Sequence, residues 1–149
     1  AVLSHSFQAN ILKGYNMGFE ENIKKSLGRK TRKQGEIEEQ IKVFAWARKN
    51  EKKHHELRLL YASANGGKRD IRTATLLKMS GVMAGVPDIH FPIAKHFYNS
   101  LYIEMKYGKN GLSKEQKKVK LLLEAYSNKV VICYSSEEAI NEIKYYLAI

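Results

Sequence analysis

The spacing of apolar residues predicts alternating helices and strands from Glu36 onward. The first helix is expected at 36–50, where apolar residues recur every three or four positions: Ile37, Ile41, Phe44 and Ala45. Four short apolar runs are expected to form strands, at 57–62, 88–93, 101–107 and 129–134. Three further helices are expected, at 71–80, 113–126 and 135–147. This order predicts an α/β domain built around a mixed sheet.

Polar residues at the expected element ends support these boundaries. Two pairs have the spacing of a capping box at the start of a helix: Ser113 with Gln116, and Ser135 with Glu138. Gly81 follows the helix expected at 71–80 and suits the residue just beyond a helix end. Turns are expected at two positions: Asn65-Gly66-Gly67 and Asn110-Gly111.

Residues 1–33 differ from the rest of the chain. They are rich in lysine, arginine, glycine and asparagine, and they contain few acidic residues. We expect a partly ordered basic arm at 1–33 and a folded domain at 34–149. A solvated tail and a contact with a DNA backbone both explain such a charge run.

Composition narrows the class of partner. The 149 residues include 26 Lys and Arg against 15 Asp and Glu, a formal net charge of +11. This charge favours a polyanion such as nucleic acid, with an anionic membrane surface as the competing interpretation. The single cysteine, Cys133, excludes an internal disulfide and a cysteine-built zinc site. With no apolar run of about 18 residues and no leader pattern, a cytoplasmic location is expected.

The strongest candidate chemistry lies in the strands at 88–93 and 101–107. Glu104 and Lys106 share one strand face, because alternate side chains point the same way. Alone this is an ordinary ion pair, but Asp88 at the start of the preceding strand supplies a second carboxylate. Two converging carboxylates suit a hard cation such as Mg²⁺ or Mn²⁺, and the Lys106 amine would lie beside its bound water or a phosphate oxygen.

Other polar residues fall near this pair in the expected fold. Glu36, Glu39 and Gln40 share one face of the first helix, directed away from Ile37 and Ile41. That face either reaches the same metal or is exposed to solvent. His90 shares the strand face of Asp88 and is either packed or beside the site.

The order of these motifs resembles the virus-type replication-repair nuclease (VRR-NUC) family of the PD-(D/E)xK nuclease superfamily. The resemblance covers about 36–147. It is carried by segments in the family's order: Glu36-Ile37-Glu38-Glu39-Gln40, Phe44-Ala45-Trp46, Asn65-Gly66-Gly67-Lys68-Arg69, Leu76-Leu77-Lys78, Gly81-Val82-Met83-Ala84-Gly85-Val86-Pro87-Asp88, Leu101-Tyr102-Ile103-Glu104-Met105-Lys106, Ser113 with Gln116, and Val130-Val131-Ile132-Cys133-Tyr134.

The resemblance implies a restriction-endonuclease-like core, a mixed four-stranded sheet flanked by helices. It implies that Asp88, Glu104 and the backbone carbonyl of Met105 bind the metal and that Lys106 is the catalytic lysine. The helical acid would be Glu36 or Glu39, and the pattern does not choose between them. Two glutamines would line the site: Gln40 and Gln116. A cap alone also explains Gln116.

The activity implied is metal-dependent, structure-selective cleavage of DNA by hydrolysis of phosphodiester bonds. Small stand-alone members of the family, often encoded by phages or prophages, resemble dimeric Holliday-junction resolvases. We therefore expect a homodimer that resolves four-way junctions in a bacterial or phage-infected cell. The alternatives are a flap or linear-duplex nuclease on the same scaffold, or an inactive module that binds branched DNA.

Basic residues outside the arm are expected to contact the DNA backbone. The candidates are Lys68, Arg69, Arg72, Lys78, Lys114 and Lys117. No recognition helix and no aromatic stacking platform stands out, so we expect backbone and shape recognition with strong salt dependence. No small-molecule cofactor is expected. The lack of a strongly amphipathic basic terminal helix argues against a membrane-surface protein.

Overall fold

The computed structural model describes residues 32–63 and 70–149, within one compact unit, Arg32–Ile149. Predictions for 1–31 and 64–69 lie outside the described residues, including most of the basic arm, the turn at 65–67, Lys68 and Arg69. The division into an arm and a domain stays a prediction. No helix in the described ranges is long and apolar enough to cross a membrane.

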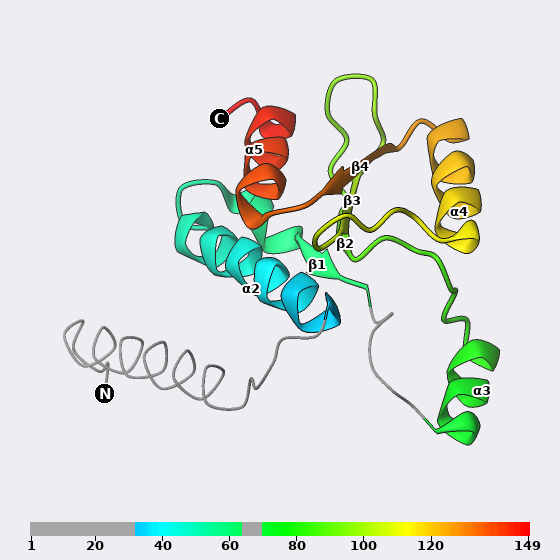
Figure 1. The fold of residues 1–149 in the computed structure, drawn as a ribbon. Helices are drawn as coiled ribbons and strands as arrows, with labels where there is room; N and C mark the ends of the chain where they lie inside the picture. The colour runs from blue at the N-terminus through cyan, green and yellow to red at the C-terminus, as the bar shows by residue number, and fades with distance from the viewer. Residues whose placement is uncertain (1–31, 64–69) are drawn as a thin grey trace, which may run out of the picture. The chain divides into compact units, whose positions relative to one another are not determined.

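The described elements follow the predicted order of helices and strands (Figure 1). In chain order they are α2 (Arg32–Asn50), the 3₁₀ helix η1 (His55–Leu59), β1 (Tyr61–Ala62), α3 (Ile71–Met79), β2 (Ile89–Phe91), β3 (Leu101–Met105), α4 (Lys114–Ala125), β4 (Lys129–Cys133) and α5 (Ser136–Leu147).

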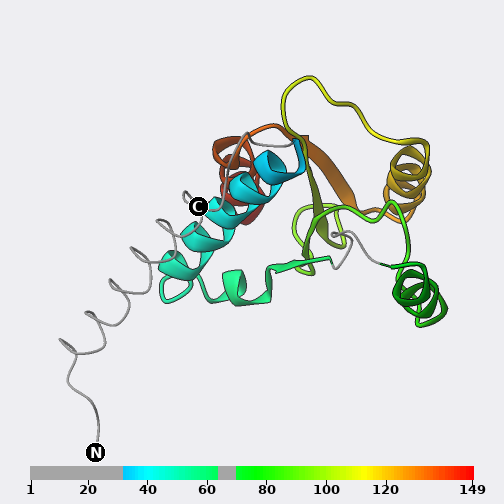
Figure 2. The same ribbon diagram turned by 60° about the horizontal axis from the view of Figure 1, so that its bottom comes forward.

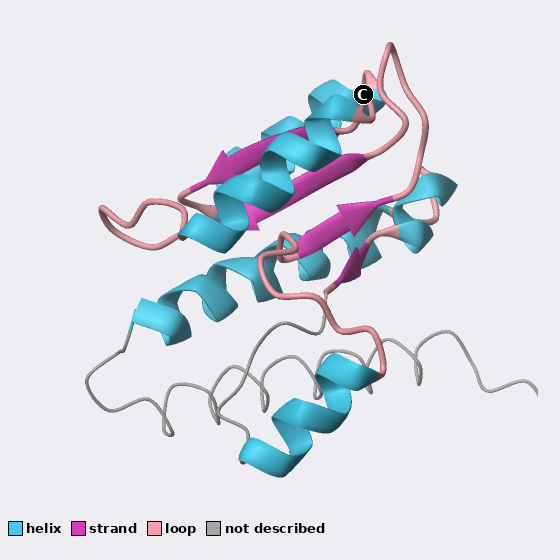
Figure 3. Ribbon diagram, turned by 90° about the vertical axis from the view of Figure 1, so that its right-hand side faces the viewer, coloured by secondary structure: helices cyan, strands magenta, loops and turns pink. Residues whose placement is uncertain are grey.

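The four strands form one mixed sheet in the order β1-β2-β3-β4 (Figure 3). β1, β2 and β3 pair antiparallel, whereas β3 and β4 pair parallel. A parallel pair needs a crossover, and α4 provides it. The α helices α2 and α5 lie next to each other on one side of the sheet, and α4 lies on the other (Figure 2). The predicted α/β class with a mixed four-stranded sheet flanked by helices is confirmed.

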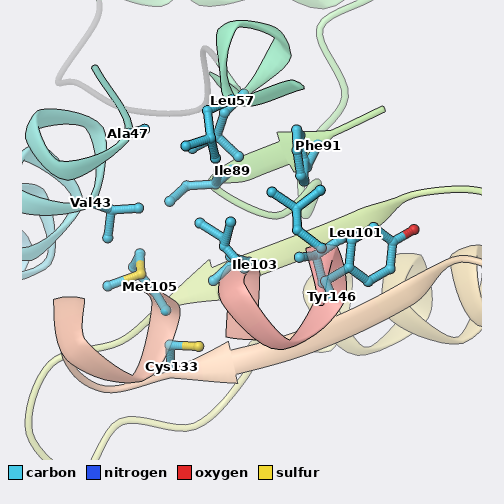
Figure 4. Close-up of a cluster of buried hydrophobic side chains, with 14 residues drawn as sticks. Val43, Ala47, Leu57, Ile89, Phe91, Leu101, Ile103, Met105, Cys133 and Tyr146 are labelled. Atoms are coloured by element: carbon cyan, nitrogen blue, oxygen red, sulfur yellow. The ribbon is translucent and has the colours of Figure 1, made fainter. Parts of the chain in front are cut away.

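The core lies between the sheet and the helices α2 and α5 (Figure 4). β3 directs Leu101, Ile103 and Met105 into it, each fully buried. The helices contribute Val43 and Ala47 from α2, and Ala139, Ile143, Tyr146 and Leu147 from α5. Because alternate strand residues face opposite ways, this packing directs Tyr102 and Glu104 to the other face of the sheet.

The strand predicted at 57–62 is wrong over most of its length. Only Tyr61 and Ala62 pair with β2, and a 3₁₀ helix precedes them. Leu57 and Leu60 are both buried, while Leu59 is 52% exposed. Residues three apart align in a 3₁₀ helix but face opposite ways in a strand, so burial of this pair selects the helical turn.

The first helix begins earlier than predicted and buries a different face. α2 begins at Arg32, and its buried residues are Gly35, Val43 and Ala47, while Ile37 is 46% exposed. A Cβ on Gly35 would lie 2.6 Å from the Tyr107 ring, so the first turn packs against the segment after β3. This tertiary contact, rather than the apolar periodicity, sets the rotation of the helix.

The predicted caps largely hold. Ser113 and Gln116 form a complete capping box at the start of α4. Ser135 caps α5 through Glu138 N, but the Glu138 carboxylate accepts a hydrogen bond from Tyr134 N instead of completing a box. After α3, Gly81 has φ +97° and Val82 N donates to Leu77 O, as in a Schellman motif.

Candidate active site

Strand register places the two candidate carboxylates side by side. Ile89 of β2 pairs with Ile103 of β3, so Asp88 and Glu104 occupy the next positions along the two antiparallel strands. The Asp88 carboxylate also reaches across to β3, where its Oδ2 accepts a hydrogen bond of 2.9 Å from Met105 N. The pairing expected from the sequence is therefore present, and the Asp88 side chain is fixed against the end of β3.

The segment that leads into β2 passes close to the start of α4. Gly85 has φ +85°, a conformation that favours glycine. A Cβ at Gly85 would lie 2.7 Å from the Glu115 carbonyl carbon. Two residues later Pro87 is buried. Gly85 therefore allows the close approach that brings Asp88 and the first turn of α4 to the same end of the sheet.

Glu104, Lys106 and Gln116 form a closed hydrogen-bonded group. Lys106 Nζ donates to Glu104 Oε1 at 2.7 Å and to Gln116 Oε1 at 3.0 Å. Gln116 Nε2 donates to Glu104 Oε1 at 2.5 Å. Glu104 is 3% exposed and Lys106 is 7% exposed. Buried charges persist when they are paired and hydrogen-bonded, and this group meets both conditions.

Gln116 combines the two roles that the sequence left open. Its Oε1 accepts the Ser113 N–H at 2.9 Å, which is half of the capping box, and the same atom accepts from Lys106. Its amide nitrogen donates to Glu104. The capping residue of α4 is therefore also the contact that joins this helix to the polar residues of β3.

The electrostatics of the site reflect an excess of buried negative charge. Burial is the main cause that raises the pKa of Glu104 from its ordinary value of 4.5 to about 7, and the charges of Asp88 and Glu36 add to it. Lys106 acts in the opposite direction on the same group. Burial likewise raises the pKa of Asp88, partly offset by the Met105 N–H, Lys106 and Lys33. A cation placed here would relieve the repulsion.

The structure separates the two candidate helical acids. Glu36 and Gln40 line the same cleft as Asp88 and Glu104. Glu39 contacts α5 instead: its Oε2 accepts from Ser136 N at 2.7 Å and its Oε1 pairs with Lys42 at 2.5 Å. These contacts with Lys42 and Ser136 lower the Glu39 pKa despite the opposing effect of burial, which is the largest single contribution. Of the two candidates, Glu36 therefore lies in the cleft with the strand carboxylates, and Glu39 does not line it.

A cleft of about 1470 Å³ opens over this end of the sheet. Its walls come from the first two turns of α2, from α3 with the segment after it, and from the start of α4. Ile37, which we expected on the core side, lines it as well. Sequence reasoning missed Lys33, assigned to the arm, and Ser63, which follows β1; both line the cleft. Lys33 could have been found from the sequence, because it precedes Glu36 by three residues and such residues share one face of a helix.

The basic candidates differ in position. Lys78 on α3 lines the cleft. Arg72, Lys114 and Lys117 are exposed and are not among the cleft-lining residues. Lys68 and Arg69 fall in the segment that the structure does not describe. Lys33 and Lys78 are thus the described cleft lysines besides Lys106.

A comparison with solved structures finds a similar architecture. One such structure is named "VRR_NUC domain protein"; it has a TM-score of 0.65 and 26% sequence identity, and the match covers 76% of this chain and 88% of that one. This match supports the VRR-NUC assignment. The sequence motifs and the fold are therefore both similar to the VRR-NUC family. The cleft of this fold holds Asp88, Glu104, Lys106 and Glu36. No protein-family model and no curated protein sequence matches the chain.

Proposed function

We propose that this chain is a divalent-metal-dependent endodeoxyribonuclease that hydrolyses phosphodiester bonds in branched DNA. The observation that carries the proposal is the pairing of half-buried Asp88 with buried Glu104, with Lys106 beside them, in a cleft of a strongly basic protein. The resemblance to a VRR_NUC domain protein supports a nuclease-family function. No membrane partner and no small-molecule cofactor is part of the proposal.

The donor set fits Mg²⁺ or Mn²⁺. Carboxylate oxygens are the ligands these hard cations take, usually one or two from the protein with waters and substrate oxygens completing the shell. Within the part of the chain that the structure describes, no group of three or more His, Cys, Asp and Glu residues is arranged to hold a metal. Asp88 and Glu104 would therefore hold the ion, with the Met105 backbone carbonyl as a further donor, while Glu36 lines the same cleft. The ion would supply Lewis acidity toward the phosphate and an activated water.

The side chains around the carboxylates have separate tasks in this proposal. The Lys106 ammonium would hold a non-bridging phosphate oxygen and stabilise the charge that develops on it. Gln116 keeps Lys106 and Glu104 in place through hydrogen bonds to both. Gln40, on the cleft wall, would orient the substrate strand. Lys33 and Lys78 would contact phosphates beyond the cleaved one.

The substrate we favour is a four-way junction resolved by a homodimer. This follows from the resemblance to small stand-alone family members, which implies two sites that each nick one strand. A flap or linear-duplex nuclease on the same scaffold is the alternative. Buried Glu104 and Lys106, with half-buried Asp88 beside them, argue against an inactive DNA-binding module, because burying charges without a function costs stability.

The deciding experiment is cleavage of three substrates by purified protein and matched variants. A fixed four-way junction, a 5′ flap and a linear duplex are incubated with Mg²⁺, Mn²⁺ or EDTA. Asp88→Asn and Glu104→Gln are each expected to lower cleavage by at least about 10³-fold, roughly 4 kcal/mol of transition-state stabilisation, while DNA binding persists. Glu124→Gln, on the exposed side of α4, is the control and should cleave normally.

The outcomes separate the parts of the proposal. Paired symmetrical nicks on the junction alone, lost in EDTA, support a dimeric resolvase. If the flap is cut and the junction stays intact, the proposed active site stands, but the proposed junction substrate and homodimer are overturned. Full activity of Asp88→Asn would overturn the site itself. Comparing Glu36→Gln with Glu39→Gln tests the helical acid, and only the first should lower cleavage.

A further inference from the structure

Three aromatic side chains form a row across β1, β2 and β3. Tyr61 pairs with His90, and His90 pairs with Tyr102. The His90 and Tyr102 rings stack with centroids 4.1 Å apart and planes within 6°. Tyr61 meets the His90 ring edge to face at 5.1 Å, and a hydrogen bond of 2.6 Å joins its hydroxyl group to His90 Nδ1. No sequence motif predicts this row, because its members come from three separate strands.

The aromatic row shares its sheet face with the carboxylates. His90 follows Asp88 by two residues and Tyr102 precedes Glu104 by two, so each pair projects to the same side. Two residues along a strand span about 7 Å. The core lies on the opposite face, where Ile89, Phe91, Leu101 and Ile103 are buried. A row of carboxylates and a row of rings therefore lie in parallel, about 7 Å apart.

The exposure of the row is graded toward the sheet edge. Tyr102 and His90 are half-buried, and Tyr61 on the edge strand β1 is 50% exposed. His90 Nε2 is buried without a hydrogen-bond partner within the described residues. The half-buried His90 thus fixes the orientation of the exposed Tyr61 ring through the Nδ1 contact and the edge-to-face packing.

We propose that Tyr61, held by His90 and Tyr102, is a stacking platform for an unpaired nucleobase of the DNA strand that enters the cleft. This inference rests on the proposed function and extends it to a feature of the substrate. Aromatic rings bind bases of any sequence by stacking. His90 lies about 7 Å from Asp88 along β2, and Tyr61 lies on the neighbouring strand about 5 Å farther across the sheet. Stacked bases rise about 3.4 Å per step, so the Tyr61 ring is within two to three base steps of Asp88 and within reach of a nucleotide near the cleaved phosphate.

Two observations indicate that DNA, rather than another protein, binds at the platform: its continuity with the carboxylate face and the charge of the chain. The row continues the face that carries Asp88 and Glu104, and the net charge of +11 favours a polyanion over a second copy of this chain. A base inside a duplex has neighbours on both faces, whereas an unpaired base has a free face for the ring. The platform therefore favours DNA with unpaired bases near the cleavage site over continuous duplex.

A binding experiment in EDTA tests the platform without cleavage. Fluorescence anisotropy measures the affinity of the protein for three DNAs: a duplex with a single-stranded overhang, the same duplex with an abasic overhang, and a blunt duplex. The proteins are wild type, Tyr61→Leu, Tyr61→Phe and Phe97→Leu. Phe97 is the matched control, because it is 94% exposed in the loop that joins β2 to β3 at the opposite end of the sheet.

The platform predicts a specific pattern of losses. Tyr61→Leu should weaken binding to the normal overhang about tenfold or more, with less than a twofold change on the abasic and blunt DNAs. Wild type should itself bind the abasic overhang about tenfold more weakly, a comparison that needs no variant. Tyr61→Phe keeps the ring and should retain most of the affinity, and Phe97→Leu should bind all three DNAs normally.

Contrary outcomes are distinguishable from failure of the nuclease proposal. Equal affinity of wild type and Tyr61→Leu for the normal overhang would overturn the platform, even if wild type cleaves DNA in Mg²⁺. If Tyr61→Leu changes the mass measured by sedimentation but not the affinity for the normal overhang, the platform would be overturned, and Tyr61 would instead contact a second copy of the chain. Tight, overhang-selective binding by a wild type that cleaves nothing supports the platform and overturns the nuclease. Absence of all DNA binding would overturn both.

Discussion

Glu104 and Lys106 are buried together, and each has the other as a partner at hydrogen-bond distance. Removing such a pair from water costs much free energy, and the attraction between the charges repays this cost only when the hydrogen-bond geometry is good. Gln116 shares in the arrangement by donating to the acid and accepting from the lysine. Asp88 adds a second, half-buried carboxylate that no described lysine contacts at ion-pair distance. At the scale of single residues the site is therefore short of positive charge.

This shortage predicts the pH dependence of stability in the metal-free protein. The folded state raises the Glu104 pKa from 4.5 to about 7, so between these values it binds the proton more tightly than the unfolded chain. The stability from this group is complete below pH 4.5 and is lost as the pH rises through about 7. A tenfold change in an acid constant is worth about 1.4 kcal/mol, so the free energy of unfolding should fall by about 3 kcal/mol.

Urea unfolding in EDTA at several pH values measures this loss. Glu104→Gln is the matched variant and should flatten most of the pH profile. Some slope should remain, because the Asp88 pKa is raised in the same direction. Identical profiles for the two proteins would show that Glu104 is not the group responsible. Added Mg²⁺ should restore stability near neutral pH, because the ion binds the ionised carboxylates.

The elements that carry the site are short and depend on one another for position. β2 has three residues and β1 has two, lengths that are not stable outside a sheet. The segment before β2 is fixed by its approach to α4 at Gly85, and α2 is fixed by the approach of Gly35 to Tyr107. Two glycine contacts thus set the positions of the carboxylate strands and the helical acid.

Gly85→Ala tests this dependence at the level of an element. The new Cβ would lie 2.7 Å from the Glu115 carbonyl carbon, at a φ of +85° that disfavours alanine. We expect a loss of about 2 kcal/mol or more in the free energy of unfolding. Gly111→Ala is the control, because nothing lies within 4 Å of its Cβ and its φ is not positive. That variant should change stability by less than about 0.5 kcal/mol. Equal stabilities would refute the close approach.

The whole molecule combines a small core with a strongly basic surface. The core is one cluster between the sheet and two helices, and the cleft opens away from it. α3 forms a cleft wall without any buried residue of its own. With a net charge of +11, the whole surface attracts phosphates. Lysines inside the cleft are expected to contact the bound DNA directly, whereas lysines elsewhere add only to the general attraction.

Salt dependence of DNA binding tests this distinction. Lys78→Gln removes a cleft lysine, and Lys52→Gln removes an exposed lysine just beyond the far end of α2. Both variants lose one charge. The slope of log affinity against log salt should decrease by about 1 for Lys78→Gln and change little for Lys52→Gln. Equal slopes for the two variants would indicate that the cleft does not hold the DNA backbone.

Much of the fold and part of the site follow from local pattern. The order of elements, the capping box at Ser113 and the shared face of Glu104 and Lys106 were predicted correctly, because each depends on residues two to four positions apart. The same reasoning failed at 57–62 and on the buried face of α2. In both places a tertiary contact, rather than the local period, decides which residues are buried.

The sequence by itself determined which residue types stand at each strand and helix position, and hence the acid–lysine strand and its neighbouring aspartate. Only the tertiary structure placed Glu36 rather than Glu39 in the cleft and joined Gln116 to Glu104. It also aligned three aromatic residues in one row: Tyr61, His90 and Tyr102. The physical reason is range. Backbone hydrogen bonding and side-chain alternation act over a few residues, whereas strand register and helix rotation are set by packing between segments far apart in the chain.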